Sequence, residues 1–177
     1  METKSKKEMT PEAENGKLRE LFVDQLKDIY WAEKALYKAL FQLQEAATSK
    51  KLAQAFAKHA QETEGQIAIL EQVFERLGEK AAAKKCEAME GLIKEANEII
   101  DSTEAGTYTR DVGLITAAQK TEHYEIASYG TLVEVAKQMD ETEVAQLLQK
   151  ILDQEKKTDI SLTIVAEDKV NKKAAKE

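Results

Sequence analysis

Apolar residues recur every three or four positions along most of the chain, which is the spacing of one buried helix face. This pattern predicts long helices over about 17–47, 50–77 and 110–139, and a fourth from a cap at Asp140 to about residue 170. A shorter amphipathic helix is predicted over 79–101. The single proline, Pro11, lies ahead of all five segments, so no proline interrupts them. We therefore expect an all-α fold.

The connections predict how these helices are joined. Thr48-Ser49 is a short turn, with Ser49 as the expected cap of the second helix, so the first two helices should form an antiparallel hairpin. Gly78 should end that hairpin, and Asp140 with Glu143 resembles a capping box ahead of the last helix. A helix over 79–101 would span roughly 35 Å and return the chain along the bundle. Two hairpins joined by one long helical crossover predict a ferritin-like four-helix bundle.

The 177 residues are expected to form one domain. We expect a flexible, charged N-terminal tail over 1–16, a helical bundle over 17–170 and a lysine-rich C-terminal tail over 171–177.

The composition limits the classes of partner that we expect. The net charge is −7 without a large basic patch, so no nucleic-acid partner is expected. No apolar run approaches the roughly 20 residues that span a bilayer, so no membrane association is expected either. The lone Cys86 cannot form an internal disulfide, and the chain starts with a polar stretch, Met-Glu-Thr-Lys-Ser. These features predict a cytoplasmic protein.

Ligand-type side chains interrupt the apolar face of each long helix. They are Glu33 in the first helix, His59 and Glu62 in the second, Glu122 and Glu125 in the third, and Glu155 and Asp159 in the fourth. Each lies near the middle of its helix, so all seven should meet at one level of the bundle. Residues three or four apart lie on the same side of a helix, so each pair could bind one site.

The charge of this group favours a metal centre. Six carboxylates carry six negative charges when ionised, and two divalent ions would neutralise four of them. Without metal, burial and mutual repulsion should raise the pKa values of several of these acids. Oxygen-rich ligation with one imidazole suits iron or manganese better than zinc or copper. The sequence thus predicts two iron or manganese ions per chain.

Each residue alone has a simpler interpretation. His59 could be a hydrogen-bonded core histidine, Glu33 could pair with Lys34 or Lys38, and the two carboxylate pairs could be solvated. Four interruptions at one level favour the metal interpretation.

Several neighbours of the predicted centre have open roles. His123 is turned about 100° from Glu122 and is left out of the ligand set. Asp28 could support the centre or form a surface ion pair. Three tyrosines lie within about a turn of the ligand level and could either pack or donate a hydrogen bond to a ligand carboxylate; they are Tyr30, Tyr37 and Tyr129. Cys86 and Met89 are expected in the core.

Five segments resemble the YciF/YciE-type bacterial stress proteins, a ferritin-like family that forms dimers. They are 27–34, 55–63, 85–92, 119–127 and 155–159, and the likeness extends from about residue 18 to 172. The wider relatives are rubrerythrins, bacterioferritins and manganese catalases. Glu122-x-x-Glu125 is similar to the paired glutamates of the third rubrerythrin helix. His59-x-x-Glu62 reverses the usual order of glutamate and histidine, and Asp159 stands where many relatives have a second histidine.

The sequence and the resemblance together predict a dinuclear-metal stress-response protein that acts on peroxide or oxygen and forms a homodimer. No Cys-x-x-Cys pair is present, so the electron-donating rubredoxin module of rubrerythrins is absent. A catalase-like cycle would need no such donor. Glu122 and Glu62 are candidate bridging ligands. The alternative is a non-catalytic metal-binding or structural stress protein.

Overall fold

The computed structural model describes residues 16–177. It contains α2 (Gly16–Ala46), α3 (Lys50–Arg76), α4 (Glu87–Ser102), α5 (Tyr108–Gln138) and α6 (Thr142–Val165). A π-helical turn, η1 (Ala166–Val170), and α7 (Asn171–Ala174) complete the chain. The described part of the chain has no β-strand, so the predicted all-α fold is confirmed. The N-terminal tail predicted over 1–16 lies outside the described residues, except for Gly16 at the start of α2.

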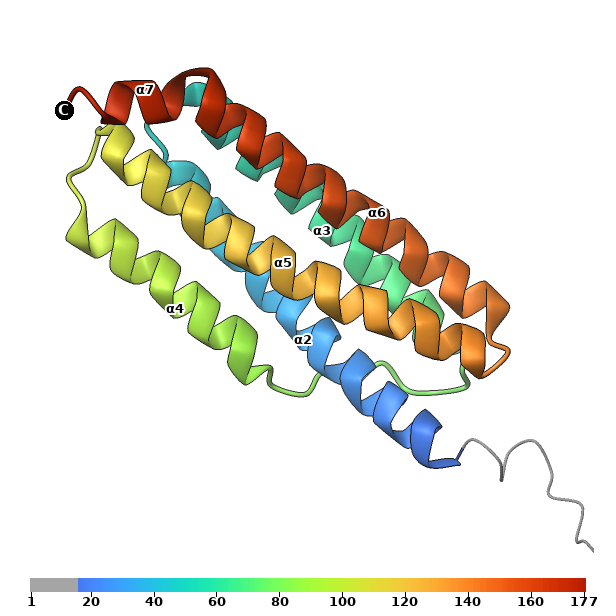
Figure 1. Ribbon diagram of the computed structural model, residues 1–177. Helices are drawn as coiled ribbons and strands as arrows, with labels where there is room; N and C mark the ends of the chain where they lie inside the picture. The colour runs from blue at the N-terminus through green and yellow to red at the C-terminus, as the bar shows by residue number, and fades with distance from the viewer. Residues whose placement is uncertain (1–15) are drawn as a thin grey trace, which may run out of the picture.

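Four long helices form the bundle, as the sequence predicted. α2 packs against α3 and α5 against α6, which makes the two expected hairpins, and α3 and α6 join them on one side. α4 connects the hairpins and packs along α5 and α2 on the outside of the bundle (Figure 1). No helix within residues 16–177 has both the length and the apolar character needed to cross a membrane.

The crossover helix begins later than predicted, at Glu87 and not at Glu79. Gly78 ends the preceding hairpin with a φ of 68°. The residues that follow, 79–85, include no apolar side chain larger than alanine, so a helix there would have little to bury. They cross α2 without helical structure, and the backbone N–H of Lys84 donates to the carbonyl of Lys27 at 3.0 Å. The Cys86 thiol then caps α4 by accepting from the N–H of Met89.

The predicted helix caps are partly wrong. Ser49 is the N-cap residue of α3, but its side chain makes no capping hydrogen bond. Asp140 has a φ of 60° and is not the cap of α6; Glu141 occupies that position, also without a side-chain cap. Positive φ is tolerated by aspartate in tight turns, which explains why Asp140 forms the turn between α5 and α6.

The last residues, which the sequence predicts as a tail, contact the start of α5. The carboxylate of Glu177 accepts hydrogen bonds from the backbone N–H groups of Tyr108 and Thr109 at 2.8 and 2.9 Å. Lys173 Nζ lies 4.2 Å from the ring centroid of Tyr108. These contacts hold α7 beside the first turn of α5 (Figure 1).

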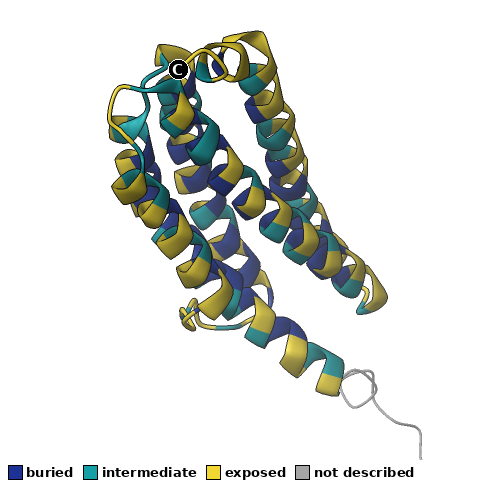
Figure 2. Cartoon of the chain, turned by 60° about the vertical axis from the view of Figure 1, so that its left-hand side comes forward, coloured by how far each residue is buried: buried dark blue, intermediate teal, exposed yellow. Residues whose placement is uncertain are grey.

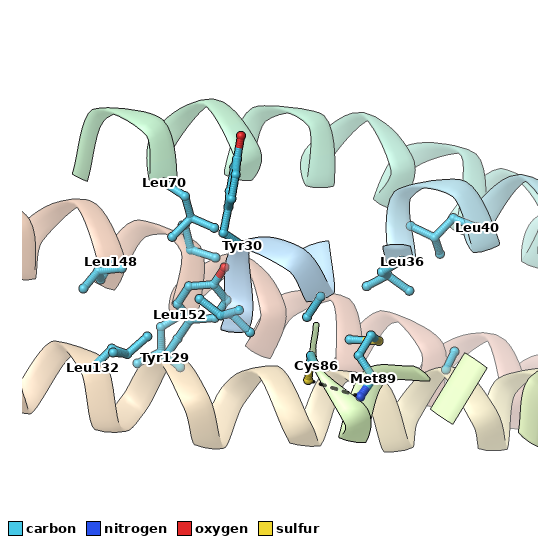
Figure 3. Packing of buried hydrophobic residues seen from close by; sticks show 14 of the residues in the cluster. Tyr30, Leu36, Leu40, Leu70, Cys86, Met89, Tyr129, Leu132, Leu148 and Leu152 are labelled. Carbon is cyan, nitrogen blue, oxygen red and sulfur yellow. Dashed lines mark hydrogen bonds between the residues drawn. The ribbon is translucent and has the colours of Figure 1, made fainter. Parts of the chain in front are cut away.

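The core lies between the four long helices, whose buried faces point inward (Figure 2). Away from the middle of the bundle it consists mainly of leucine, isoleucine, valine, phenylalanine and alanine side chains. Figure 3 shows part of it, including Tyr129 and Leu132 of α5 and Leu152 of α6, which belong to one buried cluster. This apolar packing surrounds the polar side chains at the middle of the helices.

Candidate metal centre

Five of the seven predicted ligand side chains are buried together at the middle of the bundle. α2 contributes Glu33, α3 contributes His59, α5 contributes Glu122 and Glu125, and α6 contributes Glu155. The four glutamates are 0% exposed, and His59 is 3% exposed. Each occupies a core-facing position of its helix, where an apolar residue would continue the pattern. The helix periodicity alone therefore places these groups inside.

Four of these residues are arranged closely enough to bind a single ion. His59, Glu122, Glu125 and Glu155 each offer one ligand atom, and these atoms lie within 4.8 Å of one another. Atom Nε2 of His59 is 3.2 Å from Oε1 of Glu122. Three carboxylates and one imidazole form an oxygen-rich set that suits iron or manganese. We call these four residues together with Glu33 the buried acid cluster.

Most polar atoms of the buried acid cluster lack hydrogen-bond partners among residues 16–177. The atoms without one are both oxygens of Glu122 and of Glu125, both ring nitrogens of His59, Oε2 of Glu33 and Oε2 of Glu155. The 3.2 Å contact between His59 and Glu122 does not have the geometry of a hydrogen bond. Buried polar groups in native proteins are nearly always paired, because an unpaired one costs about 1–3 kcal/mol. So many unpaired oxygen and nitrogen atoms at one place fit a site where these atoms bind a cation.

Burial makes these glutamates weak acids in the protein without metal. Desolvation, followed by the charge of Glu155, raises the pKa of Glu33 to about 8. Desolvation also raises the pKa of Glu122 to about 8. The pKa values of Glu125 and Glu155 lie well above normal, again mainly through desolvation and then through neighbouring glutamates. The cluster therefore holds protons near neutral pH, and a bound cation would displace them.

Two neutral side chains hold carboxylates of the cluster in place. The hydroxyl of Tyr129 donates to Oε1 of Glu33 at 2.5 Å, and Nε2 of Gln66 donates to Oε1 of Glu155. Of the roles considered for Tyr129, the structure shows the hydrogen bond to a predicted ligand. Gln66 was not singled out as a functional residue. Its signal is a polar residue, 1% exposed, one turn beyond Glu62 on the apolar face of α3.

The other two tyrosines contact groups outside the cluster. The hydroxyl of Tyr30 donates to Oε1 of Glu71 at 2.8 Å, and the ring of Tyr37 packs edge-on against Phe41.

Glu62 and Asp159 are not in the close group of four. The Glu62 side chain is 25% exposed and its Oε1 is 2.6 Å from Nζ of Lys58. The Asp159 side chain is 22% exposed, and its Oδ1 accepts from Nε2 of Gln119 at 3.1 Å. Each lies one helical turn from a member of the cluster, and the charges of both raise the pKa of Glu122. They form its partly exposed side.

The other residues that the sequence places near the predicted centre lie outside the buried acid cluster. The His123 side chain is 71% exposed, and its Nε2 is 3.5 Å from Oδ1 of Asp159. Asp28 accepts a 2.9 Å hydrogen bond from the Tyr124 hydroxyl, which also lies 3.0 Å from the Cys86 sulfur. Cys86 and Met89 are buried in the core, as predicted.

Comparisons with known proteins agree with this fold. Residues 17–175 match the family described as a domain of unknown function, DUF892. Protein YciF of Escherichia coli is 51% identical over 158 residues, which cover 89% of this chain and 95% of that protein. The crystal structure of this stress protein superposes with a TM-score of 0.84 over 88% of this chain and 98% of that one.

A second solved structure is YcfI of Rhodopseudomonas palustris, described there as a candidate structural protein. It is 38% identical, with a TM-score of 0.80 over 82% of this chain and 92% of that one. The family match spans most of the chain, and the Escherichia coli relative exceeds half identity over nearly its whole length. The chain therefore belongs to the DUF892 family, which includes the stress protein YciF.

Proposed function

We propose that this protein is a ferritin-like dinuclear-metal protein that binds two iron or manganese ions per chain and acts on peroxide or oxygen during stress. The observation that carries the proposal is the buried acid cluster, whose carboxylates and imidazole are covered by apolar packing and lack partners among the described residues. A purely structural core would gain stability by replacing these groups with apolar ones. The relation to a stress protein supports the physiological setting.

Each residue has a proposed part in the centre. Glu33, His59, Glu122, Glu125 and Glu155 would hold the ions, and Glu122, with two unpaired oxygens next to His59, is the first candidate for a bridging ligand. The sequence also predicts Glu62 and Asp159 as ligands, with Glu62 as a second bridge; both are partly exposed and lie outside the close group of four, so we do not count them among the residues that would hold the ions. Iron or manganese would supply the change of oxidation state that reduces or disproportionates peroxide.

The chain itself would contribute orientation and exclusion of water. Tyr129 and Gln66 each hold one carboxylate oxygen, so the remaining oxygens of Glu33 and Glu155 keep a fixed direction. The apolar residues around the cluster exclude bulk water, which strengthens the attraction between carboxylates and cations.

The test is to measure metal content and peroxide turnover on the same preparation. Protein expressed in medium rich in iron and manganese should contain about two ions per chain and release oxygen or consume peroxide when mixed with hydrogen peroxide. The double variant Glu122→Gln/Glu125→Gln should lose the metal and the turnover. The matched control Glu64→Gln/Glu95→Gln changes exposed glutamates on α3 and α4 and should retain both.

A second candidate is a non-catalytic metal-binding or structural stress protein, which the description of YcfI as structural favours. Bound ions without peroxide turnover would support the binding role. Protein with no bound metal whose stability is unchanged by added iron or manganese would support the structural role. Sizing of the same samples would test the expected homodimer.

A further inference from the structure

Two partly exposed carboxylates lie one helical turn from members of the buried acid cluster. Glu62 follows His59 by one turn on α3, and Asp159 follows Glu155 by one turn on α6. Their side chains are about a quarter exposed, whereas the cluster glutamates are wholly buried. We call Glu62 and Asp159 the uptake pair. They are the acids of this group that solvent reaches.

The uptake pair is held by contacts that exchange easily. Glu62 pairs with the exposed Lys58, one turn earlier on the same helix. Asp159 accepts from Gln119 and lies near the exposed His123. Exposed ion pairs contribute about 0–1 kcal/mol, so a divalent cation can compete for either carboxylate. Neither contact ties the uptake pair permanently to the surface.

The uptake pair is also next to the cluster along its helices, because Glu62 is three residues from His59 and Asp159 is four residues from Glu155. The charges of both residues raise the pKa of Glu122, and the charge of Glu62 raises that of Glu155 as well. Glu122 in turn has two unpaired oxygens and is 0% exposed. The uptake pair is therefore reached by solvent and lies one helical turn from residues of the cluster.

The side of the bundle that α4 covers offers a cation less. α4 packs there on α5 and α2, and a cavity of about 250 Å³ lined by Asp28 and Tyr124 lies beside it. The Asp28 carboxylate is already bonded to the Tyr124 hydroxyl, which also contacts the buried Cys86 thiol. The uptake pair offers two carboxylates to solvent, which favours its side for a cation.

We propose that Glu62 and Asp159 are the route by which divalent cations reach the buried acid cluster, and that they receive cations from solvent and transfer them to Glu122 and Glu155. This inference rests on the metal site of the proposed function. It assigns the uptake pair a transient role, in contrast to the permanent ligation that the sequence predicts for the same two residues.

Kinetics distinguish the two roles. A residue that only lies on the route changes association and release by the same factor, so the dissociation constant stays unchanged. A permanent ligand mainly changes release, so its loss weakens binding. The experiment mixes metal-free protein rapidly with Co²⁺ as a probe, follows its visible absorbance, and then measures release to excess chelator. Equilibrium dialysis gives the dissociation constant and the number of ions bound.

The variant Glu62→Gln/Asp159→Asn should slow both association and release by about tenfold or more, a typical effect of charges that steer an ion. Its dissociation constant should remain within about threefold of wild type, and the number of bound ions should be unchanged. Added salt should slow association of wild type more than of this variant. The control Glu64→Gln/Asp153→Asn removes two exposed acids from the same helices and the same net charge, and should keep wild-type rates.

Three results would overturn the inference. Wild-type rates in the uptake-pair variant would show that cations enter elsewhere, while leaving the metal site intact. Faster release with weaker binding would identify the two residues as permanent ligands. A wild-type protein that binds no cobalt, manganese or iron would end both this inference and the proposed function.

Discussion

Helix α5 buries acids in two places, at its first turn and at its centre, and their surroundings differ. Asp111, at the first turn, accepts hydrogen bonds at 2.7 Å from the backbone N–H groups of both Thr48 and Ser49. Glu125, at the centre, has no hydrogen-bond partner for either oxygen among the described residues. Both are 0% exposed. Burial alone therefore does not distinguish a structural acid from a candidate ligand; the partners of its oxygens do.

The two sites also differ in what the acid accomplishes. The Asp111 carboxylate joins the start of α5 to the turn between α2 and α3, and so fixes one hairpin against the other. Burial raises the pKa of Asp111, while the two backbone hydrogen bonds act in the opposite direction. At Glu125, burial and the neighbouring charges of Glu33 and Glu155 all raise the pKa. The first acid stabilises the fold, and the second destabilises it unless a cation binds.

The largest expected effect is at Asp111. Asp111→Ala leaves two backbone N–H groups without their acceptor, and we expect a loss of about 3 kcal/mol in the free energy of unfolding. Urea unfolding at pH 7 measures it. Asp101→Ala, at an exposed site on α4, is the control and should change stability by less than about 0.5 kcal/mol. Metal content should be unchanged in Asp111→Ala, and a stability equal to wild type would contradict the structural role.

The next effect is a pH dependence of stability that arises from the central glutamates. The pKa values of Glu33 and Glu122 rise from 4.5 to about 8 on folding. The folded protein therefore binds more protons than the unfolded chain between these values. Stability of the metal-free protein is full below about pH 4.5 on this account and is lost as the pH rises through about 8, by at most about 1.4 kcal/mol per pH unit and site.

Urea unfolding in the presence of a chelator at pH 5.5, 6.5 and 7.5 measures this slope. Glu122→Gln keeps the size of the side chain and removes one titrating group, so its slope should be shallower and its stability at pH 7.5 higher than wild type. Glu64→Gln should retain the wild-type slope. An unchanged slope in Glu122→Gln would show that this glutamate does not gain protons on folding.

The sequence predicted the helices and the buried acid cluster because both follow from helix periodicity. It placed Glu62 and Asp159 in the same layer because residues three or four apart share a side of a helix. That rule is approximate: a step of three residues turns the side chain by about 300° and a step of four by about 400°. The second member of a pair is therefore turned from the first. In two pairs it is partly exposed, whereas Glu122 and Glu125 both remain buried.

The sequence patterns did not predict contacts between residues far apart in the chain. Ser49 is a favourable cap residue by its type, but its side chain makes no capping hydrogen bond. Its backbone N–H donates instead to the carboxylate of Asp111, which lies 62 residues away along the chain. The crossover helix was predicted too long because alanine and lysine favour helix formation locally. Residues 79–85 have no apolar side chain larger than alanine to bury against α2, and they are not helical in the structure. Both differences arise because tertiary packing outweighs local preference.

The smallest expected effect measures how much one hydrogen-bond partner stabilises a glutamate of the buried acid cluster. The Tyr129 hydroxyl donates to Glu33 and lowers its pKa, against the larger effect of burial. Tyr129→Phe keeps the ring packing, removes this hydrogen bond, and should cost about 1 kcal/mol in the metal-free protein at pH 7.5. Tyr37→Phe, whose hydroxyl makes no hydrogen bond within residues 16–177, is the control and should cost less. Equal stabilities of the two variants would mean that the Tyr129 hydrogen bond does nothing for Glu33. A loss near 1 kcal/mol at Tyr129, against about 3 kcal/mol at Asp111, would mean that single partners satisfy the central acids only in part, which leaves their other oxygens free for a cation.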